Sequence, residues 1–296
     1  MRILKSWQAE LFLLFMTFIW GGTFLFTKLG IKDCPPSLYI IFRFSIALII
    51  SFSIFGKYLF RIKKEQLLHG LVLGLLFGSG FILQTYGLKF TTITKSAFIT
   101  GIAVVMTPFA YWFVERKRIR IWSKIGVFIA AIGLWIFTNP KFDNINLGDV
   151  LTLLSTAFWA FYITYMDVFT RFVFKFEQTA QLVIMQYIAA TPIAVLTFFA
   201  FDINEIQVYF SKNLIISLIY NGIFASFFLT WIHTSVQKFT TPVKAALIFS
   251  LEPIVASLVA YYAQNELMGF LGIIGAIILM LGVVVSEFGE YIVKSK

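Results

Sequence analysis

Long runs of apolar residues, separated by short polar segments, follow one another along almost the whole chain. A helix that crosses a bilayer needs about 20 mostly apolar residues, whereas the strands of a membrane barrel alternate polar and apolar residues. We therefore predict an all-α integral membrane protein with ten transmembrane helices. The predicted helices are Ala9–Leu29, Leu38–Leu59, Leu67–Leu88, Ile93–Val114, Ile121–Thr138, Gly148–Thr170, Thr179–Ala200, Leu214–Val236, Val243–Tyr262 and Leu267–Val285.

The composition also indicates that lipid is the main solvent of the chain. Hydrophobic residues make up 59% of the 296 residues and charged residues only 13%, whereas about 45–50% apolar is usual in soluble domains. The single cysteine, Cys34, excludes an intramolecular disulfide, and a Cys/His metal site lacks its ligands. We predict no cofactor. The basic start leads into an apolar run without a small-residue cleavage site, so we expect a retained first helix and not a signal peptide.

The net charge of +10 is concentrated in short basic clusters between the apolar runs. With the N-terminus placed in the cytoplasm, 17 Lys and Arg residues fall on the cytoplasmic side and six on the outer side, with Arg43 inside the second helix. This bias sets orientation in membranes, so we expect both termini in the cytoplasm and the chain in the cell (inner or plasma) membrane. Clusters flanking membrane helices attract anionic lipid, and we expect no nucleic-acid partner.

A polar tetrapeptide indicates an internal repeat, because Lys89–Thr92 recurs unchanged as Lys238–Thr241, 149 residues later. A slightly different separation relates Trp20 to Trp159, each in the first helix of its half. Chance similarity explains any one match between apolar helices but not an identical polar tetrapeptide in register with a glycine pair. The separation of 149 residues also relates Lys95 to Lys244, Ala97 to Ala246, Gln84 to His233, Gly126 to Gly275 and Gly133 to Gly282.

We predict two five-helix repeats, residues 1–145 and 146–296, that form one membrane unit. Because five is odd, the second repeat enters the membrane from the opposite side, and the two are related by a pseudo-two-fold axis in the membrane plane. Secondary transporters recurrently have this plan, with the substrate site near the midplane between the repeats.

Glu252 is the most informative polar residue, because it lies near the centre of the predicted ninth helix and precedes Pro253. An ionised carboxylate at mid-membrane costs roughly 2.5–3.5 kcal/mol, and the proline frees the carbonyl of Phe249 and kinks the helix. Two interpretations stay open: an acid that couples protons or binds a substrate amine, and a structural hydrogen bond between helices. Pro108 is expected to free the Val104 carbonyl in the fourth helix, at a non-equivalent place.

Other polar and aromatic residues at membrane depth have two interpretations each. His233, with Gln84 at the matching site, either titrates in a functional site or bonds neighbouring helices. Arg43 either snorkels to the outer interface or attracts anions at a gate. Trp20 and Trp159 are too central for the interfacial belt, so each packs in the bundle or stacks on an organic substrate.

Glycines spaced for close helix contact occur in both halves. Gly70, Gly74 and Gly78 form one stripe on the third helix, and small residues at this spacing let helices approach closely in lipid. We predict packing, with a sliding surface as the alternative. Gly126, Ala130 and Gly133, and Gly275 with Gly282, are interpreted as packing positions too.

The sequence resembles the drug/metabolite transporter superfamily, EamA type, over essentially the whole chain. The matching elements are Trp20-Gly21-Gly22-Thr23, Arg43-Phe44, Leu251-Glu252-Pro253-Ile254 leading to Asn265-Glu266, and the pairs Gly126…Gly133 and Gly275…Gly282. The resemblance implies ten helices in two EamA repeats and alternating access, often in exporters of amino acids or related metabolites in bacterial inner membranes.

We therefore expect a secondary transporter, an exporter of amino acids or related small metabolites, with proton coupling left open. The alternatives are an uptake permease for another metabolite class, an intramembrane enzyme, for which His69 and His233 offer little, and a channel, which would need a continuous polar path. No phosphate-binding loop is present. The residues expected to line the substrate cavity are Trp20, Thr23, Gln84, Trp159, Tyr162, Asn221, His233 and Glu252, with Arg43 and Glu252 as gating or charge-bearing residues; none is expected to be catalytic or to bind metal.

Overall fold

The computed structural model describes residues 4–138, 145–264 and 269–294, and within these ranges it is helical apart from short connections. The predicted all-α class is confirmed. The elements are α1 (Ser6–Gly30), α2 (Pro36–Phe55), η1 (Gly56–Arg61), α3 (Lys64–Phe90), α4 (Ile93–Gly101), α5 (Ala103–Glu115), α6 (Ile121–Thr138), α7 (Leu147–Thr170), α8 (Phe176–Thr197), η3 (Phe198–Asp202), α9 (Lys212–Leu218), η4 (Ile219–Phe228), α10 (Leu229–Val236), η5 (Gln237–Phe239), α11 (Pro242–Phe249), α12 (Glu252–Gln264) and α13 (Phe270–Lys294).

Ten apolar helical segments follow one another along the described ranges, as the hydrophobic pattern predicts. Eight are long and apolar enough to cross a bilayer, and two shorter apolar helices, Ile121–Phe137 and Phe270–Ser286, complete the set. The predicted start of the last helix at Leu267 and the motif residues Asn265 and Glu266 lie outside the described residues.

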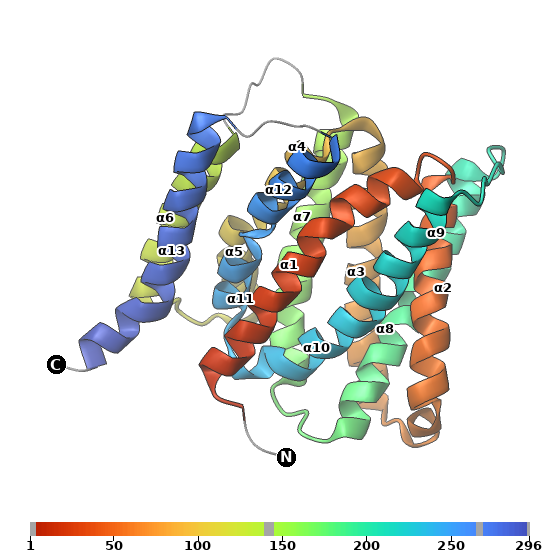
Figure 1. Cartoon of the computed structure of the whole chain (residues 1–296). Helices are drawn as coiled ribbons and strands as arrows, with labels where there is room; N and C mark the ends of the chain where they lie inside the picture. The colour runs from red at the N-terminus through yellow and green to blue at the C-terminus, as the bar shows by residue number, and fades with distance from the viewer. Residues whose placement is uncertain (1–3, 139–144, 265–268, 295–296) are drawn as a thin grey trace.

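The two halves run through the bundle in opposite senses. α1 begins and α13 ends at the lower end of the bundle in Figure 1, which we call the terminal face. α7, the first helix of the second half, begins at the other end, which we call the opposite face. We call α1–α6 the first half and α7–α13 the second half. The inverted arrangement of two five-helix repeats is therefore present in the structure.

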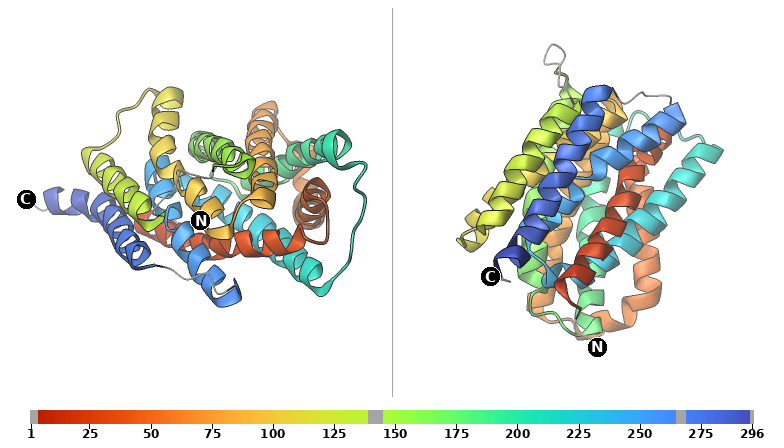
Figure 2. Two further views of the ribbon diagram at one scale, coloured as in Figure 1. Left: turned by 90° about the horizontal axis from the view of Figure 1, so that it is seen from above. Right: turned by 60° about the vertical axis from the view of Figure 1, so that its left-hand side comes forward.

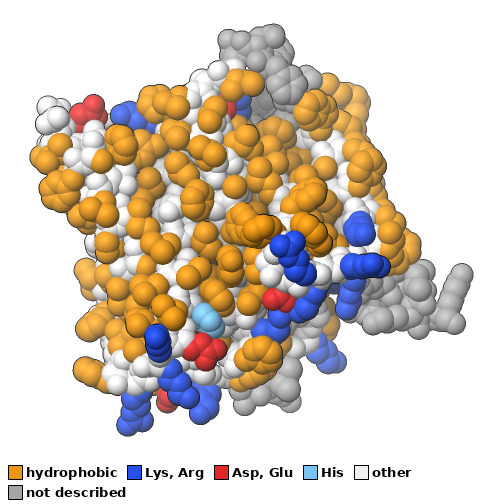
Figure 3. All heavy atoms as spheres, turned by 180° about the vertical axis from the view of Figure 1, so that it is seen from behind, with side chains coloured by type: hydrophobic (Ala, Val, Ile, Leu, Met, Phe, Trp, Pro, Cys, Tyr) orange, Lys and Arg blue, Asp and Glu red, His pale blue; other side chains and the backbone are white. Residues whose placement is uncertain are grey.

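The surface matches a lipid environment. Large hydrophobic side chains such as Phe109, Phe128 and Phe201 are exposed, and hydrophobic side chains cover most of the face seen in Figure 3. Basic side chains gather mainly in the lower part of that view, toward the terminal face.

One membrane crossing in each half is a broken helix. The helix breaks at Ile102, between α4 and α5, and at Ser250 and Leu251, between α11 and α12. The repeat separation of 149 residues relates Ile102 to Leu251, so the two breaks are equivalent. Pro108 lies inside α5, six residues after the break at Ile102.

Glycines bring neighbouring helices into close contact, as predicted. The stripe on α3 faces α8, where a Cβ added at Gly78 would lie 3.0 Å from the Cα of Ala190. α6 and α13 lie side by side at the edge of the bundle (Figure 2). A Cβ added at Gly126 would lie 2.6 Å from the carbonyl oxygen of Gly282. The absence of side chains at these positions sets the helix spacing.

Candidate functional site

A small cavity lies between the two halves, at the broken helices. Its volume is about 60 Å³, enough for one or two water molecules and well below the roughly 300–1,000 Å³ of ordinary ligand pockets. The cavity is therefore contracted in this conformation. Its lining residues are Trp20, Thr23, Phe24, Phe81, Gln84, Thr100, Gly101, Trp159, Tyr162, Ile163, His233, Phe249, Ser250 and Glu252.

The cavity wall reproduces the internal repeat almost residue for residue. The helices α1 and α7 contribute equivalent positions, as do α3 and α10, and α4 and α11. Only Phe81 and Glu252 lack an equivalent in the lining. The related pairs are Trp20 with Trp159, Thr23 with Tyr162 and Phe24 with Ile163, 139 residues apart, and Gln84 with His233, Thr100 with Phe249 and Gly101 with Ser250, 149 residues apart.

Trp20 is fixed by a widened helical segment of the second half. The π-helical η4 frees carbonyl groups from regular α-helical bonding, and the Nε1 of Trp20 donates a 3.1 Å hydrogen bond to the carbonyl of Ala225 in this segment. The indole ring meets His233 and Phe249 edge to face, with centroid distances of 5.8 and 5.0 Å. The side chain of Thr23 bonds the carbonyl of Trp20.

Trp159 has a similar place but a different hydrogen-bonding state. Its ring lies edge to face with Phe81 at a centroid distance of 4.7 Å and packs closely over Gly80. Its Nε1 is buried and has no hydrogen-bond partner in the part of the chain that the structure describes. An unsatisfied buried donor costs about 1–3 kcal/mol, so a polar group that enters the cavity would gain by accepting this bond.

The remaining polar groups of the wall are partly satisfied. The Gln84 amide donates to the Thr100 hydroxyl at 3.0 Å. The Nε2 of His233 lies 2.9 Å from the Oε1 of Gln237, while its Nδ1 is buried without a partner. The Tyr162 hydroxyl donates to Gln186, on the side of α7 that faces α8.

Glu252 is buried, and its carboxyl group has no hydrogen bond or ion pair with any described residue. It is the first residue of α12, where backbone N–H groups and the helix dipole favour negative charge. The repeat places Ala103 at the equivalent position of the first half. A carboxyl group without a partner in an aromatic cavity is suited to a cation or a proton.

Arg43 does not snorkel to the interface, because its side chain is 1% exposed. Its Nε donates to the Ser226 hydroxyl at 2.8 Å, and the guanidinium lies 4.1 Å from the ring centroid of Phe81, which lines the cavity. One terminal nitrogen of the guanidinium has no hydrogen-bond partner within the described ranges. Arg43 therefore lies behind the cavity wall and not in it.

Asn221 is not among the residues that line the cavity. It is fully buried, and its side-chain amide donates to the Thr27 hydroxyl at 3.0 Å and the Tyr39 hydroxyl at 2.6 Å. The position of Asn221 within the predicted helix indicated that it is buried, but not toward which neighbours its side chain points. The π-helical segment changes which face of the helix each residue occupies.

An ion pair joins the two halves at the opposite face. Lys95, near the start of α4, lies 2.5 Å from Asp149 in the first turn of α7. Asp149 also accepts a 2.8 Å hydrogen bond from the hydroxyl of Thr91. Asp149 is ten residues before Trp159 on α7, about 15 Å along the helix axis.

A related ion pair joins the halves at the terminal face. Lys244, near the start of α11, lies 3.3 Å from Glu10 in α1, and the hydroxyl of Thr240 donates to the same carboxylate at 3.4 Å. Glu10 is ten residues before Trp20, so the cavity has a charged contact at a similar distance toward each face.

The ion pairs account for the two threonines of the repeated tetrapeptide. Its last threonine, Thr92 or Thr241, caps α4 or α11, and each hydroxyl accepts from the backbone N–H of the lysine that forms the ion pair, Lys95 or Lys244. The preceding threonine of each copy binds the acid. Sequence reasoning noted both lysines but missed the acids. The signal was available, since Glu10 and Asp149 share the separation of 139 residues that relates Trp20 to Trp159.

Comparison with known proteins places both halves in one family. A family model described as the EamA-like transporter family matches residues 7–139 and 146–288. An uncharacterized transporter of Archaeoglobus fulgidus is 27% identical over 285 residues, 95% of this chain and 86% of the relative. The uncharacterized transporter YoaV of Bacillus subtilis is 22% identical over 92% of this chain and 94% of its own.

The fold also matches a solved structure titled "Crystal structure of protein". The TM-score is 0.72, and the match covers 96% of this chain and 97% of the other, at 16% identity. At that identity the likeness supports the fold alone.

Proposed function

Since the chain belongs to the EamA-like transporter family and is a multi-pass membrane transporter, we propose that it exports amino acids or related small metabolites by alternating access. The substrate would bind in the cavity between the halves, and each ion pair would close the path toward one face. We further propose residues 1–145 and 146–296 as the two repeats, acting as one unit.

One observation carries this proposal: a contracted cavity with pseudo-symmetric walls has an equivalent ion pair toward each face. A metabolite does not fit in about 60 Å³, so the bundle has to open for substrate to enter and leave. Because the ion pairs occupy equivalent positions in the two halves, the movement that opens one face would be equivalent to the movement that opens the other. Inverted repeats with broken helices at the midplane support this mechanism.

The charges near the cavity favour a substrate that carries both an ammonium and a carboxylate group. Glu252 supplies a carboxyl in the wall and Arg43 a guanidinium behind Phe81, and neither has an ionic partner among the residues that the structure describes. Aromatic rings line the same cavity as this carboxyl, and the faces of aromatic rings attract cations. A zwitterionic amino acid would pair with Glu252 through its ammonium group and would draw Arg43 toward its carboxylate.

Glu252 is also our candidate for proton coupling. An acid that binds either a proton or the substrate ammonium makes the two mutually exclusive, so a proton entering from one face would displace substrate bound from the other. The absence of an ionic partner for this carboxyl among the described residues supports such a role.

The basic residues support an orientation with both termini in the cytoplasm of the cell membrane. Most Lys and Arg residues of the connections belong to the terminal face, and the cytoplasmic side of membrane proteins carries this excess. Export is the direction that the family resemblance favours, and uptake is the alternative.

Transport in proteoliposomes tests the proposal. Purified protein would be reconstituted and given a panel of radiolabelled amino acids and other metabolites, with and without a pH gradient. We expect saturable flux and counterflow, in which unlabelled substrate inside drives uptake of labelled substrate. Flux that does not saturate and gives no counterflow would indicate a channel, and chemical conversion of the substrate would indicate an enzyme. Either result would overturn the proposal.

A further inference from the structure

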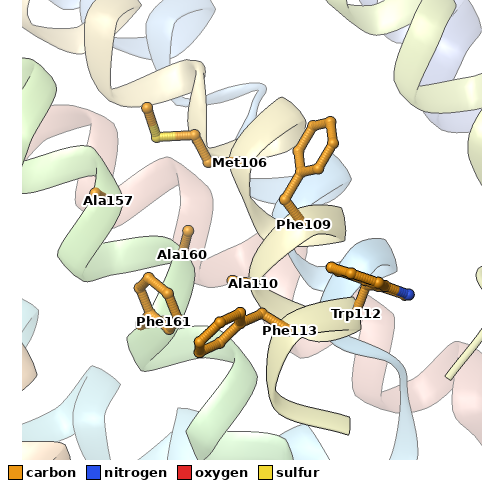
Figure 4. A pocket seen from close by; sticks show the side chains of 8 residues that line it. All are labelled: Met106, Phe109, Ala110, Trp112, Phe113, Ala157, Ala160 and Phe161. Carbon is orange, nitrogen blue, oxygen red and sulfur yellow. The ribbon is translucent and has the colours of Figure 1, made fainter. Parts of the chain in front are cut away.

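An apolar groove lies on the outer surface between α5 and α7, away from the central cavity. Phe109 and Phe113 of α5 and Phe161 of α7 form its walls, and Ala110, Ala157 and Ala160 form its floor. Figure 4 shows Ala110 and Ala160 between the aromatic rings, with Phe113 and Phe161 drawn close together in the lower part of the view. Their ring centroids are 6.2 Å apart.

The size and position of the groove fit a hydrocarbon chain. Its volume is about 340 Å³, at the small end of the range for ligand pockets, and none of its lining side chains is charged. Phe109 and Phe113 are 68% and 58% exposed on helices that cross the membrane, so lipid tails surround the groove. The groove lies at the contact of the first half with the second, because α5 and α7 belong to different halves.

A cationic group lies beside the end of the groove nearest the terminal face. The guanidinium carbon of Arg116 is 4.9 Å from the ring centroid of Trp112 and 5.4 Å from that of Phe113, and both rings line the groove. Arg116 has a positive φ of 55°, unlike any other non-glycine residue in the described ranges. This left-handed backbone conformation is unfavourable for arginine and is common for glycine at a helix end. In this conformation the side chain of Arg116 stacks on the aromatic rings at the end of the groove.

The charges around this site are mostly positive. Arg116 is followed by exposed Lys117, Arg118 and Arg120 before α6 begins. The acids on the neighbouring elements are already paired: Glu115 contacts Lys117 at 2.5 Å and Arg171 at 2.9 Å, and Asp167 contacts Arg171 at 2.6 Å. Arg116 and Arg118 have no ion-pair partner among the described residues, so their charges are available to an anion.

We propose that this groove binds one anionic phospholipid, with an acyl chain between α5 and α7 and the phosphate on Arg116 and Arg118. The apolar groove lies between membrane-crossing helices, and the cationic side chains lie at its end nearest the terminal face. This arrangement matches the tail and the headgroup of a phospholipid. Basic residues at membrane interfaces attract anionic headgroups, and an adjoining groove for a tail would turn that attraction into a defined site.

Lipid retention measured by native mass spectrometry tests the proposal without requiring transport. The full chain would be reconstituted in phosphatidylcholine with phosphatidylglycerol, extracted in mild detergent, and analysed for bound lipid. We expect about one phosphatidylglycerol per chain. The double variant Arg116→Ala/Arg118→Ala should retain it at least fivefold less, and Ala157→Phe, which fills the floor of the groove, should reduce retention similarly.

The matched control is Lys63→Ala/Lys64→Ala, which removes the same charge from exposed positions at the terminal face. It should retain phosphatidylglycerol like the unaltered protein. Equal losses in the two double variants would mean diffuse electrostatic attraction, and unchanged retention in Ala157→Phe would mean that no tail occupies the groove. Either result would overturn the proposal.

A second readout compares two lipids on the unaltered protein and needs one variant only, to separate the fluorescence of Trp112 from that of the other tryptophans. Phosphatidylglycerol with brominated acyl chains should quench the fluorescence of Trp112 more strongly than brominated phosphatidylcholine at the same mole fraction, with Trp112→Phe defining the contribution of this residue. Equal quenching by the two lipids would contradict a headgroup-selective site.

Discussion

Glu10 and Asp149 occupy equivalent positions in the two halves, yet each binds a lysine at a different face of the bundle. Glu10 contacts Lys244 at the terminal face, and Asp149 contacts Lys95 at the opposite face. The environments differ: the side chains of Lys244 and Glu10 are 10% and 14% exposed, whereas those of Lys95 and Asp149 are 36% and 7% exposed. Water screens the more exposed Lys95, but its contact is the shorter, at 2.5 Å against 3.3 Å, so we expect the two contacts to be of similar strength.

The packing of α6 on α13 gives a prediction about stability. A methyl group at Gly133 would overlap the backbone nitrogen of Leu279, so Gly133→Ala has to push the two helices apart. Overpacking of this kind costs about 1–3 kcal/mol, and we expect a lower melting temperature in detergent. Gly269→Ala is the control, because nothing lies within 4 Å of the added carbon. Equal melting temperatures for the two variants would show that α6 and α13 are not packed this closely.

The two central tryptophans should respond differently to the loss of their indole N–H. Trp20→Phe removes the hydrogen bond to the Ala225 carbonyl, and a lost bond of this type destabilises by about 1 kcal/mol. Trp159→Phe removes a donor without a partner among the described residues, so it should destabilise less than Trp20→Phe, since the loss of ring packing is common to both. If substrate accepts a bond from Trp159, Trp159→Phe raises KM.

Thermal melting and transport kinetics of both variants check this expectation. Trp20→Ala, a larger change, should alter substrate affinity as well as stability. A fall in protein abundance alone, with unchanged affinity, would restrict Trp20 to a packing role.

Glu252→Gln should reduce transport at least tenfold and flatten its pH dependence, because the amide neither carries charge nor exchanges a proton. Glu177→Gln, an exposed acid in the first turn of α8, is the control and should behave like the unaltered protein. Flux and pH profile are measured in proteoliposomes. Normal flux with a normal pH profile in Glu252→Gln would remove the case for this acid.

The pseudo-symmetry offers a sharper variant of the same experiment. Ala103 is the residue of the first half that is equivalent to Glu252. The double variant Ala103→Glu/Glu252→Ala therefore moves the acid from the second half to the first. Binding of amine-bearing substrates should recover in part relative to Glu252→Ala. No recovery would mean that the surroundings of Glu252, and not the acid alone, determine binding.

The sequence predicted the helices and the repeat well because both depend on local properties. Apolar length identifies a crossing, and the two threonines of Lys89–Thr92 recur where one caps a helix and the other binds an acid. The lining residues Phe24, Phe81, Ile163 and Phe249 could not be distinguished, since phenylalanine and isoleucine occur equally at lipid-facing positions.

The direction of polar residues also depended on features that sequence does not display. Asn221 points toward Thr27 and Tyr39 because of the π-helical segment around it. The break at Ile102 in the first half was not predicted, because no proline adjoins it. Its equivalence to Leu251 became visible only once both breaks were located.

The central claim is tested most directly by measuring from which face of the membrane a cavity residue can be labelled. Thr23→Cys provides a reporter, since the native Cys34 is buried and burial raises the pKa of its thiol to about 12, which slows labelling. A small charged methanethiosulfonate would be added to vesicles of each orientation, with Glu177→Gln as the control background.

Alternating access predicts opposite effects of the two acids. Glu10→Gln should raise labelling from the terminal face and lower it from the opposite face, and Asp149→Asn should do the reverse. A contact worth about 1 kcal/mol corresponds to about a fivefold change. If each variant instead raised labelling from both faces, or changed neither, the two ion pairs would not be alternating gates and the carrier mechanism would be contradicted.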